Sequence, residues 1–308
     1  MKNVSLFTLI FFLSSGLFLC KEKTEPIPPK EETKKSTGYK KILHEITSDY
    51  SHMKVVEYND HRTLFFVRDN GEEVVESRID NLNPEKLQLG YTKNMFGALV
   101  MKKKLPRNVL LIGLGGGGMM HFSNHFFPEI QMDAVEIDPV ILKIAKEYFF
   151  LTETMASNVL IRDAYKFLET NPTKYDVIFM DAFLKPSVET DETGVSLKFK
   201  TASFYKILKS NLREDGIVVF NINQNNDSYK DIEIILENFK VVHFFHKNNS
   251  GNIIVLGSDS DLLSGKDREI MADWIDRDRK PNFSFIELLK NLKTKDEIKS
   301  YLNSQSNK

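Results

Sequence analysis

The sequence predicts an α/β protein in which a doubly wound, mainly parallel, Rossmann-like sheet follows a small antiparallel β domain. Three observations predict this arrangement. The chain has 308 residues, enough for one large or two ordinary domains whose core needs no disulfide or metal. Short β-rich runs bounded by turn residues fill the region before residue 81. After residue 108, apolar strand-like runs alternate with helical stretches, which is the pattern of a parallel sheet with crossover helices.

An export signal is predicted at residues 1–19. Lys2 precedes an apolar run at 4–19, which ends at Cys20, the only cysteine of the chain. The run is shorter than the about 20 apolar residues of a spanning helix. Its end resembles a bacterial lipobox, although Leu19 stands where a small residue is usual. The resemblance implies lipidation of Cys20 and a membrane-anchored lipoprotein of the bacterial envelope. The alternatives are a buried N-terminal helix, or an uncleaved anchor that holds the domain on the cytoplasmic face.

A flexible tether is predicted at residues 20–40, because three prolines among alternating charges cannot form a core. Residues 41–86 are predicted to form the antiparallel β domain. Its four strands are expected at 42–46, 53–58, 63–67 and 74–78, with turns at residues 59–60 and 69–71.

The Rossmann-like domain is predicted at residues 87–260, beginning with a helix at 87–101 that ends in a solvated basic run at 102–104. Strands are expected at 109–112, 132–135, 159–161, 177–180 and 217–221, and helices at 140–149 and 202–211. Residues 241–245 and 253–256 are expected to close the sheet as an antiparallel edge pair. Residues 261–308 are predicted to form charged surface helices.

Composition excludes several classes of function. Lys and Arg number 42 against 43 Asp and Glu, so no global basic field indicates a nucleic-acid partner. The single cysteine excludes a disulfide scaffold, a Cys-rich zinc site and an iron–sulfur cluster. His121 and His125 share a helix face at a metal-binding spacing, but neither a third ligand nor a glutamate accompanies them. His243 and His246 likewise have no further ligand residue at a metal-binding spacing. We therefore predict no metal site.

A glycine loop at 113–118 follows the apolar strand 109–112 and opens a helix. Gly113, Gly115 and Gly117 are the candidate binding glycines, because such a turn requires positive φ and lets the backbone approach a ligand. Glu136 ends the next strand, where its carboxylate can accept both hydroxyls of a ribose.

Residues at two further strand ends indicate which class of ligand binds. Asp163 and Ala164 can take the exocyclic amine of an adenine, and Asp181 points into the crevice where the reacting end would lie. Acids at three successive strand ends suit a cationic sulfonium better than a pyrophosphate. We therefore predict S-adenosylmethionine or a derivative as the bound co-substrate. The alternative is that Glu136, Asp138, Asp163 and Asp181 are helix N-caps.

At these residues the chain resembles the spermidine synthase (polyamine aminopropyltransferase) family, and most closely its spermidine-synthase-like bacterial branch. The resemblance covers about residues 47–257, including the motifs at 113–118, 135–139, 161–164 and 175–183. It implies a Rossmann core of the S-adenosylmethionine-dependent methyltransferase type, and transfer of an aminopropyl group from decarboxylated S-adenosylmethionine to a small amine.

The resemblance also implies residue roles. Glu136 would hold the ribose, Asp163 and Ala164 the adenine, and Asp181 would be the base that deprotonates the attacking amine. Tyr91 would orient that amine; the alternative is a ring that packs against its own helix.

The chain departs from the family at two acids. Gly116 stands where the glycine loop usually carries an acid, and Leu184 stands where a second acid follows the base by three residues. Lys185 adds a charge that would repel a diamine. We therefore expect an acceptor less highly charged than putrescine. Acids at 189, 191 and 192 could restore negative potential, although loop acids are usually solvated.

Three functions follow from these patterns. The leading one is a transferase that moves an aminopropyl or other alkyl group from a sulfonium donor to an amine. The second is a small-molecule methyltransferase that uses intact S-adenosylmethionine. The third is a catalytically silent lipoprotein that retains the fold, a hypothesis favoured by the conflict between a cytoplasmic co-substrate and an export signal. The sequence is compatible with a homodimer but does not specify one.

Overall fold

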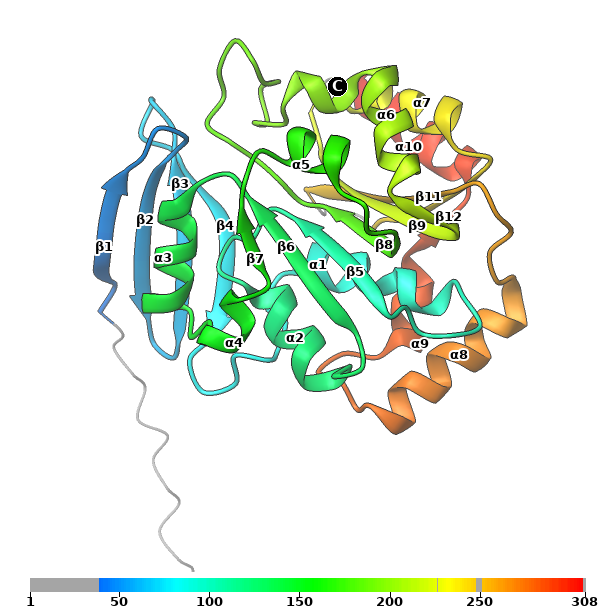
Figure 1. Cartoon of the computed structure of the whole chain (residues 1–308), viewed down its shortest axis with the longest axis horizontal. Coiled ribbons are helices and arrows are strands. Elements are labelled where there is room, and N and C mark those ends of the chain that lie inside the picture. The colour runs from blue at the N-terminus through cyan, green and yellow to red at the C-terminus, as the bar shows by residue number, and fades with distance from the viewer. Residues whose placement is uncertain (1–38, 226, 248–250, 307–308) are drawn as a thin grey trace, which may run out of the picture. The chain divides into compact units, whose positions relative to one another are not determined.

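The computed structural model describes residues 39–225, 227–247 and 251–306 (Figure 1). The predicted export signal, Cys20 and most of the predicted tether lie outside the described residues. The strands are β1 Lys41–Thr47, β2 His52–Tyr58, β3 His61–Val67, β4 Glu73–Asp80, β5 Asn108–Ile112, β6 Gln131–Glu136, β7 Val159–Ile161, β8 Tyr175–Met180, β9 Leu212–Asn223, β10 Val241–Phe245, β11 Asn252–Ser258 and β12 Leu292–Lys293. The α-helices are α1 Gly90–Met95, α2 Gly118–Phe126, α3 Pro139–Tyr148, α4 Glu153–Ala156, α5 Ala164–Thr170, α6 Ala202–Ser210, α7 Ser228–Asn238, α8 Gly265–Asp278, α9 Phe285–Leu288 and α10 Lys295–Ser306. The 3₁₀ helices are η1 Phe96–Val100, η2 Leu197–Lys200 and η3 Leu289–Asn291.

The first four strands form an antiparallel sheet in the order β1-β2-β3-β4, as predicted. Its β2–β3 hairpin turns at Asn59, which has a φ of 53° and therefore adopts the left-handed conformation that asparagine tolerates. The β3–β4 register shifts, because Leu64 is opposite Ser77 whereas Phe65 is opposite Val75. Glu76 is thus the extra residue of a β-bulge in β4.

The second sheet has the order β12-β10-β11-β9-β8-β5-β6-β7. Strands β9, β8, β5, β6 and β7 pair in parallel, while β11, β10 and β12 add antiparallel strands at one edge. This confirms the predicted doubly wound, mainly parallel sheet and its antiparallel edge pair.

Both faces of the central strands are buried. Along β5, Val109 and Leu111 belong to one hydrophobic cluster and Leu110 and Ile112 to another, as expected for a strand covered on both sides. The small sheet shares the first cluster through Met53, Val55 and Leu64. The carboxyl ends of the parallel strands therefore face β1–β4 across a shared core, an arrangement visible in Figure 1.

Two predicted segments differ from the structure. The predicted helix at 87–101 is the short α1 followed by η1, and every residue at 94–101 is buried. Such a run packs on all sides instead of presenting one helical face. The C-terminal segment is more than surface helices, because its β12 pairs with Phe244 and Phe245 and its Phe285 is fully buried.

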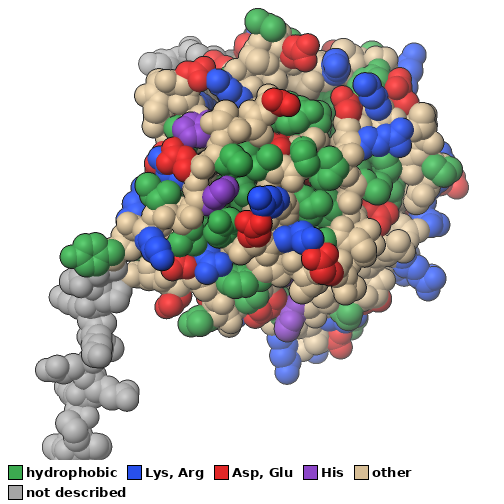
Figure 2. Space-filling view, turned by 60° about the vertical axis from the view of Figure 1, so that its left-hand side comes forward, with side chains coloured by type: hydrophobic (Ala, Val, Ile, Leu, Met, Phe, Trp, Pro, Cys, Tyr) green, Lys and Arg blue, Asp and Glu red, His purple; other side chains and the backbone are tan. Residues whose placement is uncertain are grey.

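On the surface that Figure 2 presents, basic and acidic side chains are interspersed over the described residues. None of the helices within the described ranges is both long and apolar enough to cross a membrane.

Candidate active site

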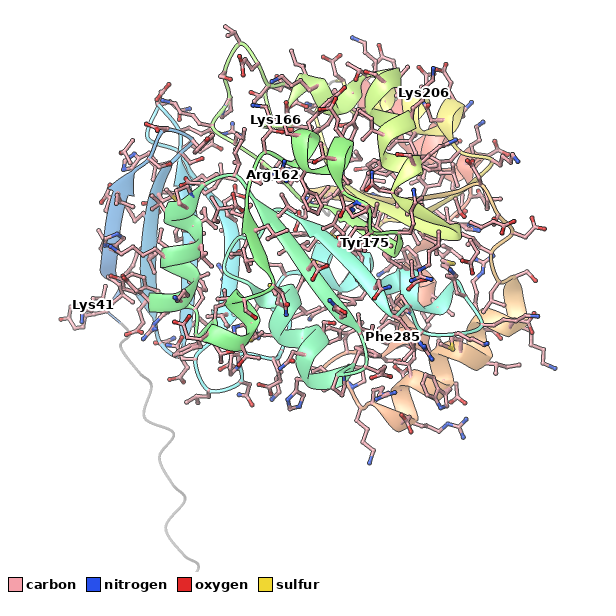
Figure 3. All side chains as sticks on the ribbon, viewed as in Figure 1. Lys41, Arg162, Lys166, Tyr175, Lys206 and Phe285 are labelled. Atoms are coloured by element: carbon pink, nitrogen blue, oxygen red, sulfur yellow. The ribbon has the colours of Figure 1, made fainter. Side chains whose placement is uncertain are left out.

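A cavity of about 600 Å³ lies at the carboxyl ends of the parallel strands. In doubly wound sheets this edge is where ligands bind. The glycine loop, α1 and the ends of β6, β7 and β8 contribute to its lining, together with β4 of the small sheet and the segment 182–199. Figure 3 shows Arg162, a lining residue, just after β7, whereas Tyr175 begins β8 at the opposite end of the strands.

The glycine loop has the predicted backbone geometry. Gly113, Gly115 and Gly117 have φ values of 94°, 52° and 75°, a region that L side chains rarely adopt. At Gly113 a Cβ would lie 2.1 Å from the backbone oxygen of Asp181, and at Gly115 it would lie 2.5 Å from Ser77 Oγ. The N–H of Gly116 donates to Ser77 Oγ at 2.8 Å, so the small sheet fixes the loop. Because these residues have no Cβ, the backbone of the loop can lie directly at the cavity.

Glu136, only 8% exposed, lies where the sequence places a ribose acceptor. Its Oε2 accepts the N–H of Leu114 at 2.9 Å and its Oε1 accepts the N–H of Asp138 at 2.9 Å. Burial raises the pKa of Glu136, while these backbone donors act in the opposite direction. A carboxylate has about four lone-pair sites, so acceptor capacity remains for ligand hydroxyls. The side chain is not a helix N-cap, and its role toward a ribose stays a prediction.

The N-cap alternative describes two of the four acids. Asp138 caps α3 by accepting the N–H of Val140 at 2.8 Å, and Asp163 caps α5 by accepting the N–H of Lys166 at 3.1 Å. Both also line the cavity, as does Ala164. Capping uses Oδ1 of Asp163, so its second oxygen remains for an adenine amine. The structural role and the predicted binding role are therefore compatible.

Asp181 and Tyr91 come together at the cavity, as the family resemblance implies. Burial raises the pKa of Asp181 to about 6, while hydrogen bonds from Asn221 and Tyr91 act to lower it. Asn221 Nδ2 donates to Asp181 Oδ1 at 2.8 Å, and Asn252 Nδ2 donates to Asn221 Oδ1 at 2.9 Å. Two strands, β9 and β11, thus orient the carboxylate. A group of this pKa is largely ionised at neutral pH and can accept a proton.

Glu76 is a cavity acid that sequence reasoning missed. Its backbone oxygen accepts the Tyr91 hydroxyl at 3.4 Å, and its side chain is close enough to Asp181 for their charges to interact. Burial raises the pKa of Glu76 to about 8, and the charge of Asp181 adds to that rise. A bulge within an otherwise alternating strand carries no clear sequence signal, so the pattern at 74–78 did not reveal this residue.

The predicted departures have structural consequences. A Cβ at Gly116 would lie 2.6 Å from Cδ1 of the buried Phe149, so an acid at 116 would require that ring to move. Lys185, which we expected to repel a diamine, forms an ion pair with Asp69 at 2.6 Å. The pair offsets its charge, and the argument for a weakly charged acceptor loses this support.

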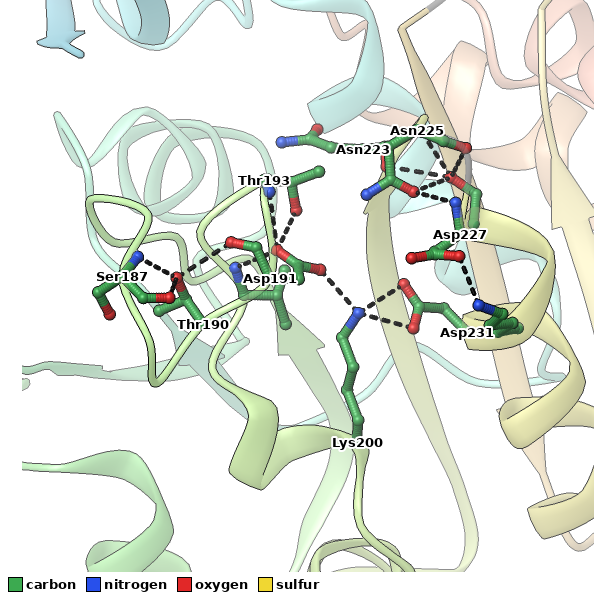
Figure 4. A network of polar contacts seen from close by, with 12 residues as sticks. Ser187, Thr190, Asp191, Thr193, Lys200, Asn223, Asn225, Asp227 and Asp231 are labelled. Carbon is green, nitrogen blue, oxygen red and sulfur yellow. Dashed lines mark hydrogen bonds and ion pairs between the residues drawn. The ribbon is translucent and has the colours of Figure 1, made fainter. Parts of the chain in front are cut away.

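The segment after Asp181, residues 182–199, forms one wall of the cavity, and ion pairs of Lys200 hold it in place. Lys200 Nζ lies 2.7 Å from Asp191 Oδ2 and 2.7 Å from Asp231 Oδ1, which joins the segment to α7 (Figure 4). Asp191 Oδ1 also accepts the N–H groups of Thr193 and Val195. Asp191 is thus occupied in fixing the loop, whereas Glu189 lies exposed at the cavity and Glu192 is solvated.

His121 and His246 contact backbone oxygens. His121 Nε2 contacts the backbone oxygen of Phe149 at 2.8 Å, and burial lowers its pKa. His246 Nδ1 contacts the backbone oxygen of Asn252 at 3.2 Å. Within the described ranges, no three His, Cys, Asp or Glu side chains gather in a way that could hold a metal ion.

Together, fold and cavity define an α/β protein of the Rossmann-like methyltransferase type with a small antiparallel sheet beside its ligand edge. Residues 88–251, more than half of the chain, match the spermine/spermidine synthase domain, and the chain belongs to that family.

The chain is similar to named relatives of two kinds. A polyamine aminopropyltransferase of Vibrio vulnificus is 29% identical over 231 residues, covering 72% of this chain and 73% of the relative. An eEF1A lysine and N-terminal methyltransferase of Mus musculus is 34% identical over 125 residues, covering 38% of this chain and 17% of the relative. Among solved structures, a probable spermidine synthase from Corynebacterium glutamicum superposes with a TM-score of 0.64 at 21% identity, covering 85% of this chain and 94% of that one.

Proposed function

We propose that this protein transfers an aminopropyl or related alkyl group from an S-adenosyl sulfonium donor to a small amine. One observation carries the proposal: the cavity joins a ribose-competent acid, Glu136, to a base, Asp181, along one edge of the sheet. The family match and the aminopropyltransferase relative support the same reaction class.

The donor would lie along the strand ends. Glu136 accepts two backbone donors and keeps lone pairs for ribose hydroxyls, while Asp163 and Ala164 offer acceptor and contact atoms for an adenine. The positive-φ glycines let the backbone approach the ligand closely.

The chemistry is a displacement at the carbon beside the sulfonium sulfur. The acceptor nitrogen forms a bond to that carbon, the carbon–sulfur bond breaks, and the sulfur leaves as a neutral thioether with the bonding electron pair. Because an ammonium has no lone pair, one proton must leave the nitrogen, and Asp181 is placed to accept it. The Tyr91 hydroxyl at Asp181 would orient the amine.

A methyltransferase that uses intact S-adenosylmethionine is the second candidate. It is favoured by the missing acids at Gly116 and Leu184 and by the similarity to a methyltransferase relative. The same base would serve, so the donor distinguishes the two reactions.

We further propose that Cys20 is lipidated and anchors the protein to the bacterial envelope membrane, on the grounds of the apolar run that ends at this residue.

Calorimetric titration of the full chain tests the proposed function. The ligands are S-adenosylmethionine, its decarboxylated form and 5′-methylthioadenosine. We expect micromolar binding of at least one sulfonium and of the thioether, with preference for the decarboxylated form if the aminopropyl reaction is correct. Preference for the intact form would indicate the methyltransferase, and no binding of any of them would reject both.

A further inference from the structure

Glu76 lies at the β-bulge of β4 and lines the cavity. The register shift between Leu64 and Phe65 leaves Glu76 without a partner residue on β3, whereas Ser77, which follows it, is paired with Leu64. Glu76 and Ser77 both line the cavity, as do Arg78 and Ile79. Bulges that re-aim a side chain are over-represented next to active sites.

The carboxylate of Glu76 has no cationic partner among the described residues. Arg68, whose charge acts on Glu76 from a distance, forms its ion pair with Glu72 at 3.2 Å. Lys185 at the rim is paired with Asp69. The groups that act on Glu76 are therefore the acid Asp181, the hydroxyl of Tyr91 and, at longer range, Arg68.

The cavity holds two neighbouring acids, Glu76 and Asp181. Burial and the charge of Asp181 both raise the pKa of Glu76, and the charge of Arg68 opposes that rise. A bound ammonium would favour the ionised form of Glu76, because its positive charge would lie near two carboxylates and it can donate up to three hydrogen bonds. The arrangement is therefore complementary to a protonated amine.

Glu76 also offers a replacement for the two acids that the resembling family carries at positions 116 and 184. Position 116 is closed to a side chain by Phe149, and position 184 carries leucine. Glu76 reaches the cavity from the small sheet, whose neighbouring Ser77 contacts the glycine loop at Gly116. Glu76 thus brings a carboxylate to the cavity from a different element.

We propose that Glu76 is a specificity-determining residue that, together with Asp181, binds the protonated primary amine of an alkylamine substrate. The inference rests on the proposed function, because it assigns the amine end of the same cavity. It explains how the site dispenses with acids at 116 and 184.

The test measures two affinities in one protein. The full chain is first titrated with 5′-methylthioadenosine, and the saturated complex is then titrated with 1,4-diaminobutane and with 1-aminobutane. In Glu76→Gln we expect at least tenfold weaker binding of both amines and thioether binding within twofold of the wild type. Glu76→Asp, which keeps the charge, should recover part of the amine affinity. Glu233→Gln, the same change at an exposed residue of α7, should alter neither affinity.

The outcomes separate this inference from the function on which it rests. A wild-type protein that binds no thioether rejects the proposed function. Thioether binding with no amine binding, or with amine affinity unchanged in Glu76→Gln, overturns the role of Glu76 alone. Equal weakening of thioether and amine would assign Glu76 a structural role and also overturn the inference.

Discussion

Replacing Lys200 should destabilise the protein by separating the cavity wall from α7. Lys200 is 19% exposed, and its two partners, Asp191 and Asp231, are 13% and 14% exposed. Lys200→Met keeps the length of the side chain but leaves two mostly buried carboxylates without their cation. Removing one partner of a buried pair costs about 3–5 kcal/mol, against about 0.2–1 kcal/mol for an exposed pair. We therefore expect a loss of about 2–4 kcal/mol in the free energy of unfolding.

The pKa directions agree with a stabilising role of Lys200. Burial acts to raise the pKa of Asp191, but the hydrogen bonds from Lys200 and Thr193 outweigh it and hold that pKa below its usual value. For Asp231, burial prevails and its pKa is raised despite Lys200. Without the lysine, both acids would become harder to ionise.

Urea denaturation at pH 7 measures the loss. The control is Lys206→Met, the same change at an exposed residue of α6 (Figure 3). If unpaired charge is the cause, Lys200→Met with Asp231→Asn should be more stable than Lys200→Met alone. A Lys200→Met protein as stable as the Lys206→Met control would show that the ion pairs of Lys200 do not stabilise the cavity wall.

Three further variants test the site, the pH dependence and the anchor. Glu136→Gln should weaken binding of 5′-methylthioadenosine by about 1–3 kcal/mol, because the amide accepts hydroxyl hydrogen bonds less strongly than the carboxylate. Unchanged affinity in a folded protein would reject the role of Glu136 in ribose binding. Asp181→Asn should lower turnover about 10²–10⁴-fold. The wild-type rate should fall as the pH drops below about 6, because Asp181 then becomes protonated. A wild-type rate that stays constant from pH 5 to 8 would contradict the role of Asp181 as base. Cys20→Ser should abolish labelling by a fatty-acid probe in bacterial cells, whereas equal labelling of both proteins would reject lipidation at that residue.

Stability against pH should report on Glu76. Its pKa in the folded protein, about 8, lies above the ordinary value of 4.5, so the folded state retains a proton that the unfolded state has lost. Stability from this group is complete below about pH 4.5 and is lost as the pH rises toward 8. Glu76→Gln should therefore raise the thermal midpoint relative to wild type at pH 9 more than at pH 5. An equal difference at the two pH values would speak against the shifted pKa.

The fold was predictable wherever local pattern decides the structure. Alternation marked the four strands of the small sheet, and buried apolar runs marked β5 to β9, because both periods are set by the backbone itself. The pattern failed at 94–101, where burial on all sides replaces a single apolar face, and at β12, which forms only by pairing with the distant β10.

The site was predictable where it depends on strand ends, and hidden where it depends on contacts between distant residues. Glu136 and Asp181 follow apolar strands, so their place at the cavity was visible in the sequence. Glu76 was hidden because a bulge changes which side its strand presents. Lys185 was misjudged because its partner, Asp69, is far away in the chain.

A transfer assay with the full chain, isotopically labelled decarboxylated S-adenosylmethionine and 1,4-diaminobutane tests the proposed reaction directly. Mass spectrometry follows both products of the displacement. We expect 5′-methylthioadenosine and aminopropylated amine in equal amounts, with both lost in Asp181→Asn. Thioether affinity without any transfer, to this amine or to 1-aminobutane and from either the decarboxylated or the intact donor, would contradict the proposed function and favour a silent lipoprotein that retains the fold.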